Sequence, residues 1–434
     1  MTKISRVLAL PIFICFFLLS GCEKDNYGIN PNNKKDKFVF DVTWTEETTY
    51  FDEDALDDLE RVDSEDHRYY FNSSNTAAAN LNEGDIIVIH GLALRKVSSI
   101  EEVSNQIVVE TEYAQMNEAI ADGEVEWDYG VNFDSDLMPE LLYNGQRYPF
   151  KKSKGDSLSL SMNIGKFAYK ISMKFNGDKA DVTQEIERSV GGVTKVRFIC
   201  QGVIESFRTS NKITYKNSEV QTFDNNNKGL KGELKLSLDA AGSGSDKINF
   251  EFPATLLTFP FTVGPIPVMV SLKVQFVAAA VVPPEGSSRI AATFTYDSST
   301  GLNYSLGGGI KAGGSEGKHK IKKEIAQTGA ASAIGINFGL GFPRLEIALF
   351  GETIVPWVQT AFLIGGDFTF LPACQTAKAA YIGAVGYKLG FLGLGYEDTK
   401  TLWNIEEILL KAGDCDKSPQ MFTESLDQLG ISLE

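Results

Sequence analysis

Histidine is scarce in this chain, and the residue patterns of common catalytic sites are missing. Three histidines occur among 434 residues. The sequence has no HExxH motif, no phosphate-binding GxxxxGK[ST] loop and no GxGxxG turn after a strand, so zinc proteolysis, nucleotide hydrolysis and dinucleotide chemistry have no support. It also has no CxxC pair or Cys/His cluster of the kind that holds structural zinc. We therefore expect no metal site and no cofactor.

The first 22 residues have the organisation of an export signal. Lys3 and Arg6 precede an uncharged run from Val7 to Ser20, which is shorter than the roughly 20 apolar residues that span a bilayer. The run ends in Leu-Ser-Gly-Cys, and these residues resemble the lipobox of bacterial lipoproteins. In that family the cysteine thiol receives diacylglycerol and becomes the new N-terminus. The resemblance implies a lipidated Cys22, and the alternative is an ordinary signal peptide that ends near a cysteine.

The charge of the chain is acidic. There are 57 Asp and Glu against 41 Lys and Arg, and loss of residues 1–21 would change the formal charge from −16 to −18. Phosphate backbones repel such a chain, so no nucleic-acid partner is expected. Attachment to the lipid bilayer through the acylated N-terminus needs no basic patch.

The residues after Cys22 bear on which membrane holds the protein. Glu23 stands where an aspartate keeps lipoproteins of enteric bacteria in the inner membrane. Glu23-Lys24-Asp25 loosely resembles the charged surface-export signals of Bacteroidota lipoproteins. We therefore expect a lipid anchor in the outer membrane, with the folded part on the cell surface or in the periplasm.

Of the five cysteines, Cys15 is expected to leave with the signal and Cys22 to carry the lipid, so three would remain. Cys200 lies in an apolar, strand-like run and is expected to be buried. Cys374 and Cys415 border such runs and are the candidate disulfide, which an exported protein can form. Three free thiols are the alternative.

No long apolar run after the signal qualifies as a membrane helix. The stretch from Ile248 to Val282 is nearly uncharged, but Pro253, Pro260, Pro265 and Pro267 interrupt it. Its remaining part, Val268–Val282, alternates in the manner of a long strand.

Strand periodicity dominates from Ser157 onward. Residues Leu158–Phe175 alternate on both sides of a Gly-Lys turn and predict a hairpin with one buried face. Another turn is expected at Asn225–Gly229. From Ala379 to Tyr396 both faces are apolar or small, which predicts a strand buried on both faces. The sequence therefore predicts an all-β fold of antiparallel, sandwich-like sheets with a small β-rich N-terminal module.

The chain divides by composition into five segments. We expect a lipoprotein signal peptide at 1–21, a flexible tether at 22–37, a small β-rich module at 38–150, a large antiparallel β domain at 151–416 and a polar C-terminal tail at 417–434. Within the module, Glu46–Asp66 holds eleven acidic residues, which we interpret as a solvated loop or short helix rather than a calcium site.

Three weak signals for chemistry remain. Gly313–Gly317 matches the nucleophile elbow of hydrolases, but a basic, strand-like segment follows it where a helix is required. A pair of glycosidase carboxylates cannot be read from sequence, because their separation depends on the fold. The four tryptophans are a possible sugar-stacking platform, although tryptophans more often fill cores; they are Trp44, Trp127, Trp357 and Trp403.

Together these observations favour an exported, membrane-anchored protein that binds or adheres without catalysis. We assign no catalytic residue, and the ligand-binding residues and the protein or glycan partner stay open. Two alternatives are retained: a secreted hydrolase acting on glycans, and a carrier of a hydrophobic ligand.

Overall fold

The computed structural model describes residues 35–431, apart from 135–138, 154–155, 191–193, 243–245, 283–285, 329–333, 370–372, 414 and 416–421. About 75% of the described residues lie in strands and about 6% in helices. The all-β prediction is therefore confirmed. The segment expected as a signal peptide, 1–21, and the expected lipidation site, Cys22, lie outside the described residues.

The described strands form three sheets, and the largest, which we call the large sheet, has 12 strands. Nine of them follow one path of neighbours: β1 (Lys37–Trp44), β8 (Ile120–Val131), β16 (Phe207–Lys216), β17 (Glu219–Gly242), β15 (Thr194–Glu205), β14 (Lys179–Val190), β13 (Phe167–Phe175), β12 (Leu158–Ile164) and β11 (Lys151–Lys152). On the free side of β17 the sheet continues through β20 (Gly286–Ser305), which pairs with β21 (Gly309–Ser315) and β22 (Lys320–Thr328). The hairpin expected at Leu158–Phe175 is confirmed as β12 and β13.

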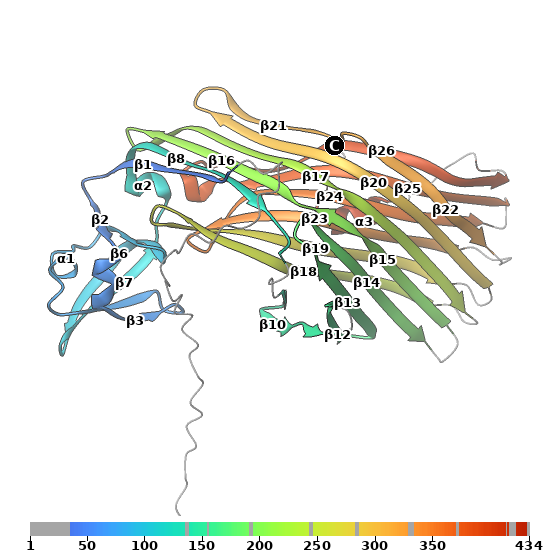
Figure 1. The fold of residues 1–434 in the computed structure, drawn as a ribbon, viewed down its shortest axis with the longest axis horizontal. Helices are drawn as coiled ribbons and strands as arrows, with labels where there is room; N and C mark the ends of the chain where they lie inside the picture. Colours follow the sequence, from blue (N-terminus) through green and yellow to red (C-terminus); the bar gives the residue numbers. More distant parts are fainter. Residues whose placement is uncertain are drawn as a thin grey trace, which may run out of the picture. The chain divides into compact units, whose positions relative to one another are not determined.

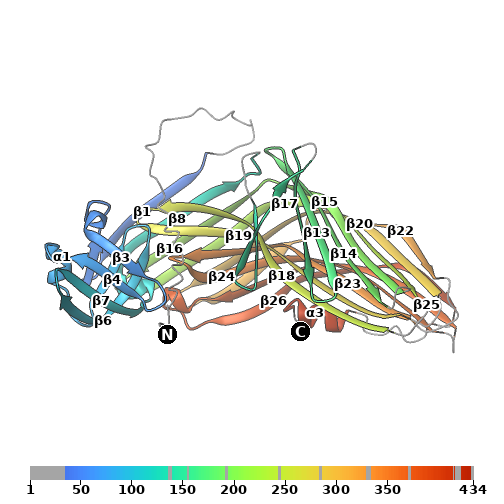
Figure 2. The same cartoon turned by 90° about the horizontal axis from the view of Figure 1, so that it is seen from below.

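The second sheet has eight strands. Their order is β10 (Gln146–Pro149), β9 (Glu140–Tyr143), β18 (Asp246–Val263), β19 (Ile266–Val282), β23 (Ile334–Leu349), β24 (Glu352–Thr369), β25 (Cys374–Lys388) and β26 (Glu397–Gly413). The long strand expected at Val268–Val282 is confirmed within β19. Figures 1 and 2 show the two sheets as layers of long strands.

Aromatic side chains fill the space between the two layers. Rings from the large sheet meet rings on β18, β23 and β24 of the second sheet. Three such pairs, with centroids 4.4–5.2 Å apart, are Phe167–Phe250, Phe198–Phe338 and Phe294–Phe362. Such large apolar side chains bury the most surface for each residue ordered. The two sheets therefore share one apolar core, as the sandwich prediction requires.

A small sheet of six strands is built from part of the N-terminal segment. Its order is β2 (Thr48–Phe51), β5 (Ile86–Ile89), β6 (Ala93–Val103), β7 (Gln106–Tyr113), β4 (Arg68–Asn72) and β3 (Leu59–Asp63). All four residues of β5 are buried because the strand separates two cores: Ile86 and Val88 join the sandwich core, and Ile87 and Ile89 join the small sheet's own core. A continuous β-branched run is what a strand buried on both faces requires.

The segments on either side of the small sheet belong to the sandwich. β1 and β8 lie in the large sheet, and β9 and β10 lie in the second sheet, although all of these residues except Lys37 come from the segment 38–150. The boundary expected at residue 150 therefore does not separate two sheets, and Asp36–Glu434 forms one compact unit. The described helices are η1 (Asp54–Asp58), α1 (Thr76–Ala79), α2 (Met116–Ala119), η2 (Gly390–Leu392) and α3 (Thr423–Gln428). None of these described helices is long enough to cross a membrane.

The turn expected at Asn225–Gly229 is wrong. These residues lie inside β17, which pairs with β16 on one side and with β20 on the other. Asn225 and Asn227 face the interior, where their amides bond to one another, and the strand only bulges between Asn227 and Leu230. Asparagine is typical of turns because its amide bonds to local backbone, and here the amides bond to each other instead.

The C-terminal segment covers part of the second sheet. The helix α3 and its flanks place Phe422, Leu426 and Leu429 on the outer face of β19, β24 and β25. This contact explains why β25 is apolar on both faces: one face meets the large sheet and the other meets α3. Residues 417–434 were expected as a polar tail, and the described part of that segment instead contributes apolar side chains to a small core.

Candidate functional sites

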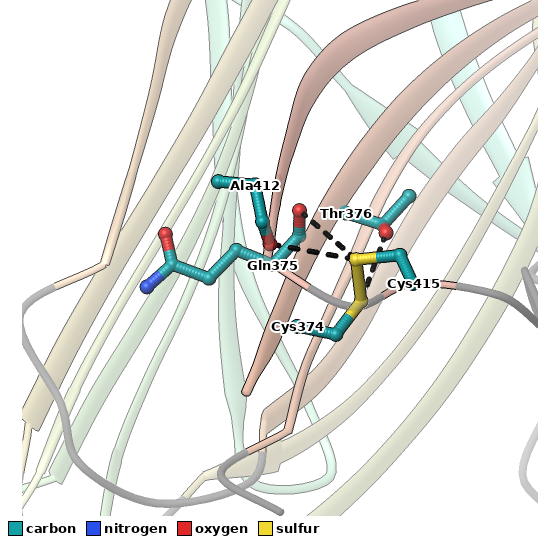
Figure 3. The surroundings of a disulfide bond; sticks show 5 residues. All are labelled: Cys374, Gln375, Thr376, Ala412 and Cys415. Atoms are coloured by element: carbon teal, nitrogen blue, oxygen red, sulfur yellow. Dashed lines mark hydrogen bonds between the residues drawn. A yellow bond between two sulfur atoms is a disulfide. The ribbon is translucent and has the colours of Figure 1, made fainter. Parts of the chain in front are cut away.

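Cys374 and Cys415 form a disulfide, with their Cα atoms 5.2 Å apart (Figure 3). Cys374 begins β25, and Cys415 follows the end of β26, the neighbouring strand. The Thr376 hydroxyl lies 3.4 Å from Cys374 Sγ and donates to it, since a disulfide sulfur carries no proton. The bond ties the outermost pair of strands in the second sheet at the point where the chain leaves it toward α3.

Cys200 is a free, buried cysteine on β15. Its side chain faces the sandwich core beside apolar neighbours, and burial raises the pKa of its thiol far above the ordinary value. A thiol with a raised pKa is a poor nucleophile because the thiolate is the reactive form. Cys200 therefore packs as a small apolar residue.

The elbow-like segment is not arranged as a hydrolase nucleophile. Ser315 ends β21, and the strand β22 follows it where an elbow needs a helix. The Ser315 hydroxyl accepts a bond from the Gly317 N–H at 3.1 Å, and His319 Nδ1 lies 3.3 Å from the Gly317 carbonyl oxygen. Both side chains are thus engaged with the local backbone.

The four tryptophans lie in separate places. Trp127 is in the sandwich core, Trp44 stands beside Tyr50, and Trp357 packs under Arg344, whose guanidinium lies 4.4 Å from the indole ring. Trp403 on β26 covers Gly383 on the neighbouring strand, where any Cβ atom would collide with the indole. Within the described part of the chain, no two of these indole rings touch, so they form no shared stacking platform.

The described carboxylates whose pKa values shift are all shifted downward. Hydrogen bonds are the main cause: Lys37 bonds to Glu126 and Lys231 to Glu205, while Ser99 bonds to Glu110 and Lys322 to Glu324. A glycosidase needs one carboxylic acid whose pKa is raised so that it can donate a proton. The pKa values of these four carboxyl groups are instead lowered, which favours their deprotonated form.

One constellation was missed by the sequence reasoning. The Tyr50 hydroxyl lies 2.7 Å from His90 Nδ1, and His90 Nε2 lies 3.2 Å from a carboxylate oxygen of Glu53. Parallel pairing of β2 with β5 places His90 next to Phe51, and the His90 N–H donates to the Phe51 carbonyl. Sequence spacing gave no signal, because 40 residues separate Tyr50 from His90.

The hydrogen bonds of this constellation place donors and acceptors around the imidazole. A carboxylate can only accept, so His90 Nε2 donates to Glu53, and Nδ1 shares its hydrogen bond with the Tyr50 hydroxyl. Burial, followed by the charges of Asp52 and Glu53, raises the pKa of Tyr50. The order hydroxyl, imidazole, carboxylate is that of a nucleophile–base–acid triad. The three groups form a hydrogen-bonded link between β2 with the residues after it and the residue that follows β5.

A small apolar pocket lies beside this link. Its lining includes Trp44, Met116 and Phe350, and the Trp44 ring is 5.7 Å from that of Tyr50. The free volume is about 10 Å³, which is about the size of one water molecule. Binding sites for drug-sized ligands are roughly 300–1,000 Å³, so this pocket does not hold a lipid or a similar molecule.

Metal ligands do not gather in the described part of the chain, where no group of three or more His, Cys, Asp or Glu side chains is placed to hold an ion. The acidic segment Glu46–Asp66 forms β2, η1 and β3. Its carboxylates include Glu60, which accepts from Asn72 at 3.0 Å, and Asp58, which accepts from Asn75 at 3.1 Å.

Comparisons with known proteins return nothing that resembles this chain. No family model matches it, and neither a curated protein nor a solved structure does so. Function must therefore be argued from the chain's own residues.

Proposed function

We propose that this protein is an exported bacterial lipoprotein, anchored in the outer membrane by an acylated Cys22, that binds or adheres to a partner without catalysis. The single observation that carries the proposal is the lipobox-like Leu19-Ser20-Gly21-Cys22 at the end of an apolar run behind a basic start.

The Cys374–Cys415 disulfide supports an exported protein. Stable disulfides form in the periplasm, at the cell surface and in secreted proteins, and reducing pathways prevent them in the cytosol. The acidic charge of the chain agrees with an anchor of acyl chains, which hold a protein to a membrane without basic residues.

The interior supports a role in binding through the surface. Phenylalanine and tyrosine rings occupy the space between the large and second sheets, so the sandwich is a packed scaffold. Rigid scaffolds commonly carry binding residues on their surface loops. The partner in this proposal is a protein or a glycan.

Substitution of the lipidated cysteine tests the proposal. Cys22→Ala should abolish incorporation of a labelled fatty acid and move the protein from the membrane fraction to the soluble fraction. Cys15→Ala is the matched control, because it removes a cysteine from the same segment without touching the lipobox, and it should behave as the wild type does. Membrane attachment of Cys22→Ala, with no label on the wild type, would refute the lipoprotein assignment.

Protease treatment of intact cells distinguishes the two faces of the membrane. Cell-surface display predicts cleavage of the folded part, and a periplasmic position predicts protection until the outer membrane is opened.

A further inference from the structure

A compact block of polar side chains lies inside the mainly apolar sandwich. Its members come from β16, β17 and β20 of the large sheet, and each is at most 4% exposed; they are Thr209, Asn211, Asn225, Asn227, Ser298 and Thr300. We call this set the polar block.

Strand register makes the block continuous. Asn211 lies opposite Asn225, and Thr209 lies opposite Asn227, in the pairing of β16 with β17. Asn227 in turn lies opposite Thr300 on β20. Directly opposed residues in antiparallel strands have Cβ atoms about 4.5–5.5 Å apart, so the polar groups are within reach of one another.

A chain of amide hydrogen bonds runs through the block. Asn227 Nδ2 donates to Asn225 Oδ1 at 3.1 Å, and Asn225 Nδ2 donates to Asn211 Oδ1 at 3.0 Å. Asn227 Nδ2 also reaches Thr300 Oγ1 at 3.4 Å. The chain of amides has two ends, at Asn227 and at Asn211.

The polar atoms at both ends have no partner within the described protein. Asn211 Nδ2 and Asn227 Oδ1 are buried and unbonded, and so are Thr209 Oγ1 and Trp127 Nε1. Trp127 belongs to the same neighbourhood, since it lies opposite Asn211 in the pairing of β8 with β16. Four unbonded polar atoms therefore gather on three adjacent strands.

Rotating the amides reverses the chain of hydrogen bonds but still leaves one free polar atom at each of its ends. Exchange of oxygen and nitrogen in all three asparagines reverses the direction of the chain, and then Asn211 Oδ1 and Asn227 Nδ2 become its free ends. A linear chain of amides always leaves a donor at one end and an acceptor at the other. Buried polar groups left unbonded cost free energy that is large beside the net stability of a domain.

We infer that the polar block binds ordered water inside the sandwich. Water fits the chemistry, because the free groups include donors (Asn211 and Trp127), an acceptor (Asn227) and a hydroxyl that does both (Thr209). Internal waters typically make about three hydrogen bonds to such groups. The bulge of β17 between Asn227 and Leu230 lies beside the block, and a bulge bends its strand away from regular pairing. This site is independent of the membrane anchor.

A high-resolution crystal structure tests the inference directly. It should show water within about 2.7–3.2 Å of Asn211 Nδ2 and Asn227 Oδ1, the usual range for such bonds. Bonds from these atoms to protein groups, with no solvent density between the sheets, would overturn it. Density for a molecule larger than water would overturn it as well.

Oxygen-17 magnetic relaxation dispersion tests the same site in solution. The wild type should show long-lived internal water, and the double variant Asn211→Leu/Asn227→Leu should show fewer such waters. Ile213→Leu is the matched control, since it changes a buried apolar residue on the same face of β16 and should leave the signal unchanged. An equal signal in all three proteins would contradict the inference.

Discussion

The two faces of the second sheet are buried in different ways. The inner face meets the large sheet, and large aromatic rings such as Phe252, Phe276 and Phe338 interlock there. The outer face is covered where α3 lies on small or medium side chains such as Ala361, Leu363 and Ala380. An apolar strand face therefore does not by itself reveal whether a sheet or a short helix covers it.

The cover on the outer face depends on the sheet beneath it. α3 has six residues, which is too short for a helix to be stable alone in water. Side chains of the second sheet also bond to its last carbonyls: Gln275 Nε2 donates to the Gln428 carbonyl at 2.6 Å, and Gln359 Nε2 lies 3.5 Å from that of Leu429. These bonds satisfy groups that every helix leaves free at its C-terminal end.

The largest expected loss of stability comes from a substitution on the inner face of the second sheet, and it should exceed the loss from a substitution on the outer face. Phe276→Ala should lower the free energy of unfolding by about 3–5 kcal/mol, because Phe276 is 1% exposed among rings from both sheets that cannot close the resulting cavity. Leu429→Ala, on the outer face, should cost about 2 kcal/mol because a short helix can settle into the space. Urea unfolding of the two variants measures both values. Equal losses would show that both faces are packed with the same rigidity.

Removal of the disulfide should give the next largest loss in the free energy of unfolding. Its two cysteines are separated by 41 residues, and chain-entropy reasoning for such a loop gives roughly 3–4 kcal/mol of stabilisation. The double variant Cys374→Ser/Cys415→Ser should show this loss in urea unfolding without reductant. Cys200→Ser is a poor control, because it buries a hydroxyl, so Cys200→Ala is preferred. Free alkylation of Cys374 and Cys415 in the unreduced wild type would contradict the bond.

The smallest expected effect concerns pH. Hydrogen bonds from Lys37 and Lys231 lower the pKa values of Glu126 and Glu205 from the ordinary 4.5. Each pair therefore stabilises the fold above about pH 4.5, and this contribution is lost as the pH falls through the lowered pKa. Exposed pairs of this kind contribute about 0.2–1 kcal/mol each. Glu126→Gln/Glu205→Gln should reduce the difference in unfolding midpoint between pH 7 and pH 3, and an unchanged difference would show that the pairs contribute nothing.

Much of the sandwich could be predicted because its strands alternate regularly. Residues Leu158–Phe175 and Val268–Val282 follow the period of two that a half-buried strand imposes, and both form strands. The doubly apolar pattern correctly indicated burial on both faces for residues 379–386 in β25, but the strand predicted to continue to Tyr396 ends at Lys388 and the turn η2 follows. The pattern could not indicate α3 as the cover, because that contact joins strands to a segment more than 30 residues away.

The roles of Asn225 and Asn227 and the Tyr50–His90–Glu53 link could not be predicted from the sequence. Asn225 and Asn227 suggested a turn by composition, and only the pairing of three strands reveals that their amides bond to each other. The link depends on parallel pairing of β2 with β5, which no local sequence pattern predicts. Register and crossover connections are properties of the fold, so sites that depend on them must be read from the structure.

The N-terminus of the mature protein tests the central claim most directly. Mass spectrometry of the protein extracted from membranes should find an N-terminal peptide that begins at Cys22 and carries the mass of attached acyl chains. An unmodified Cys22, or a mature peptide that still contains residues from 1–21, would contradict the assignment of this protein as a lipid-anchored lipoprotein.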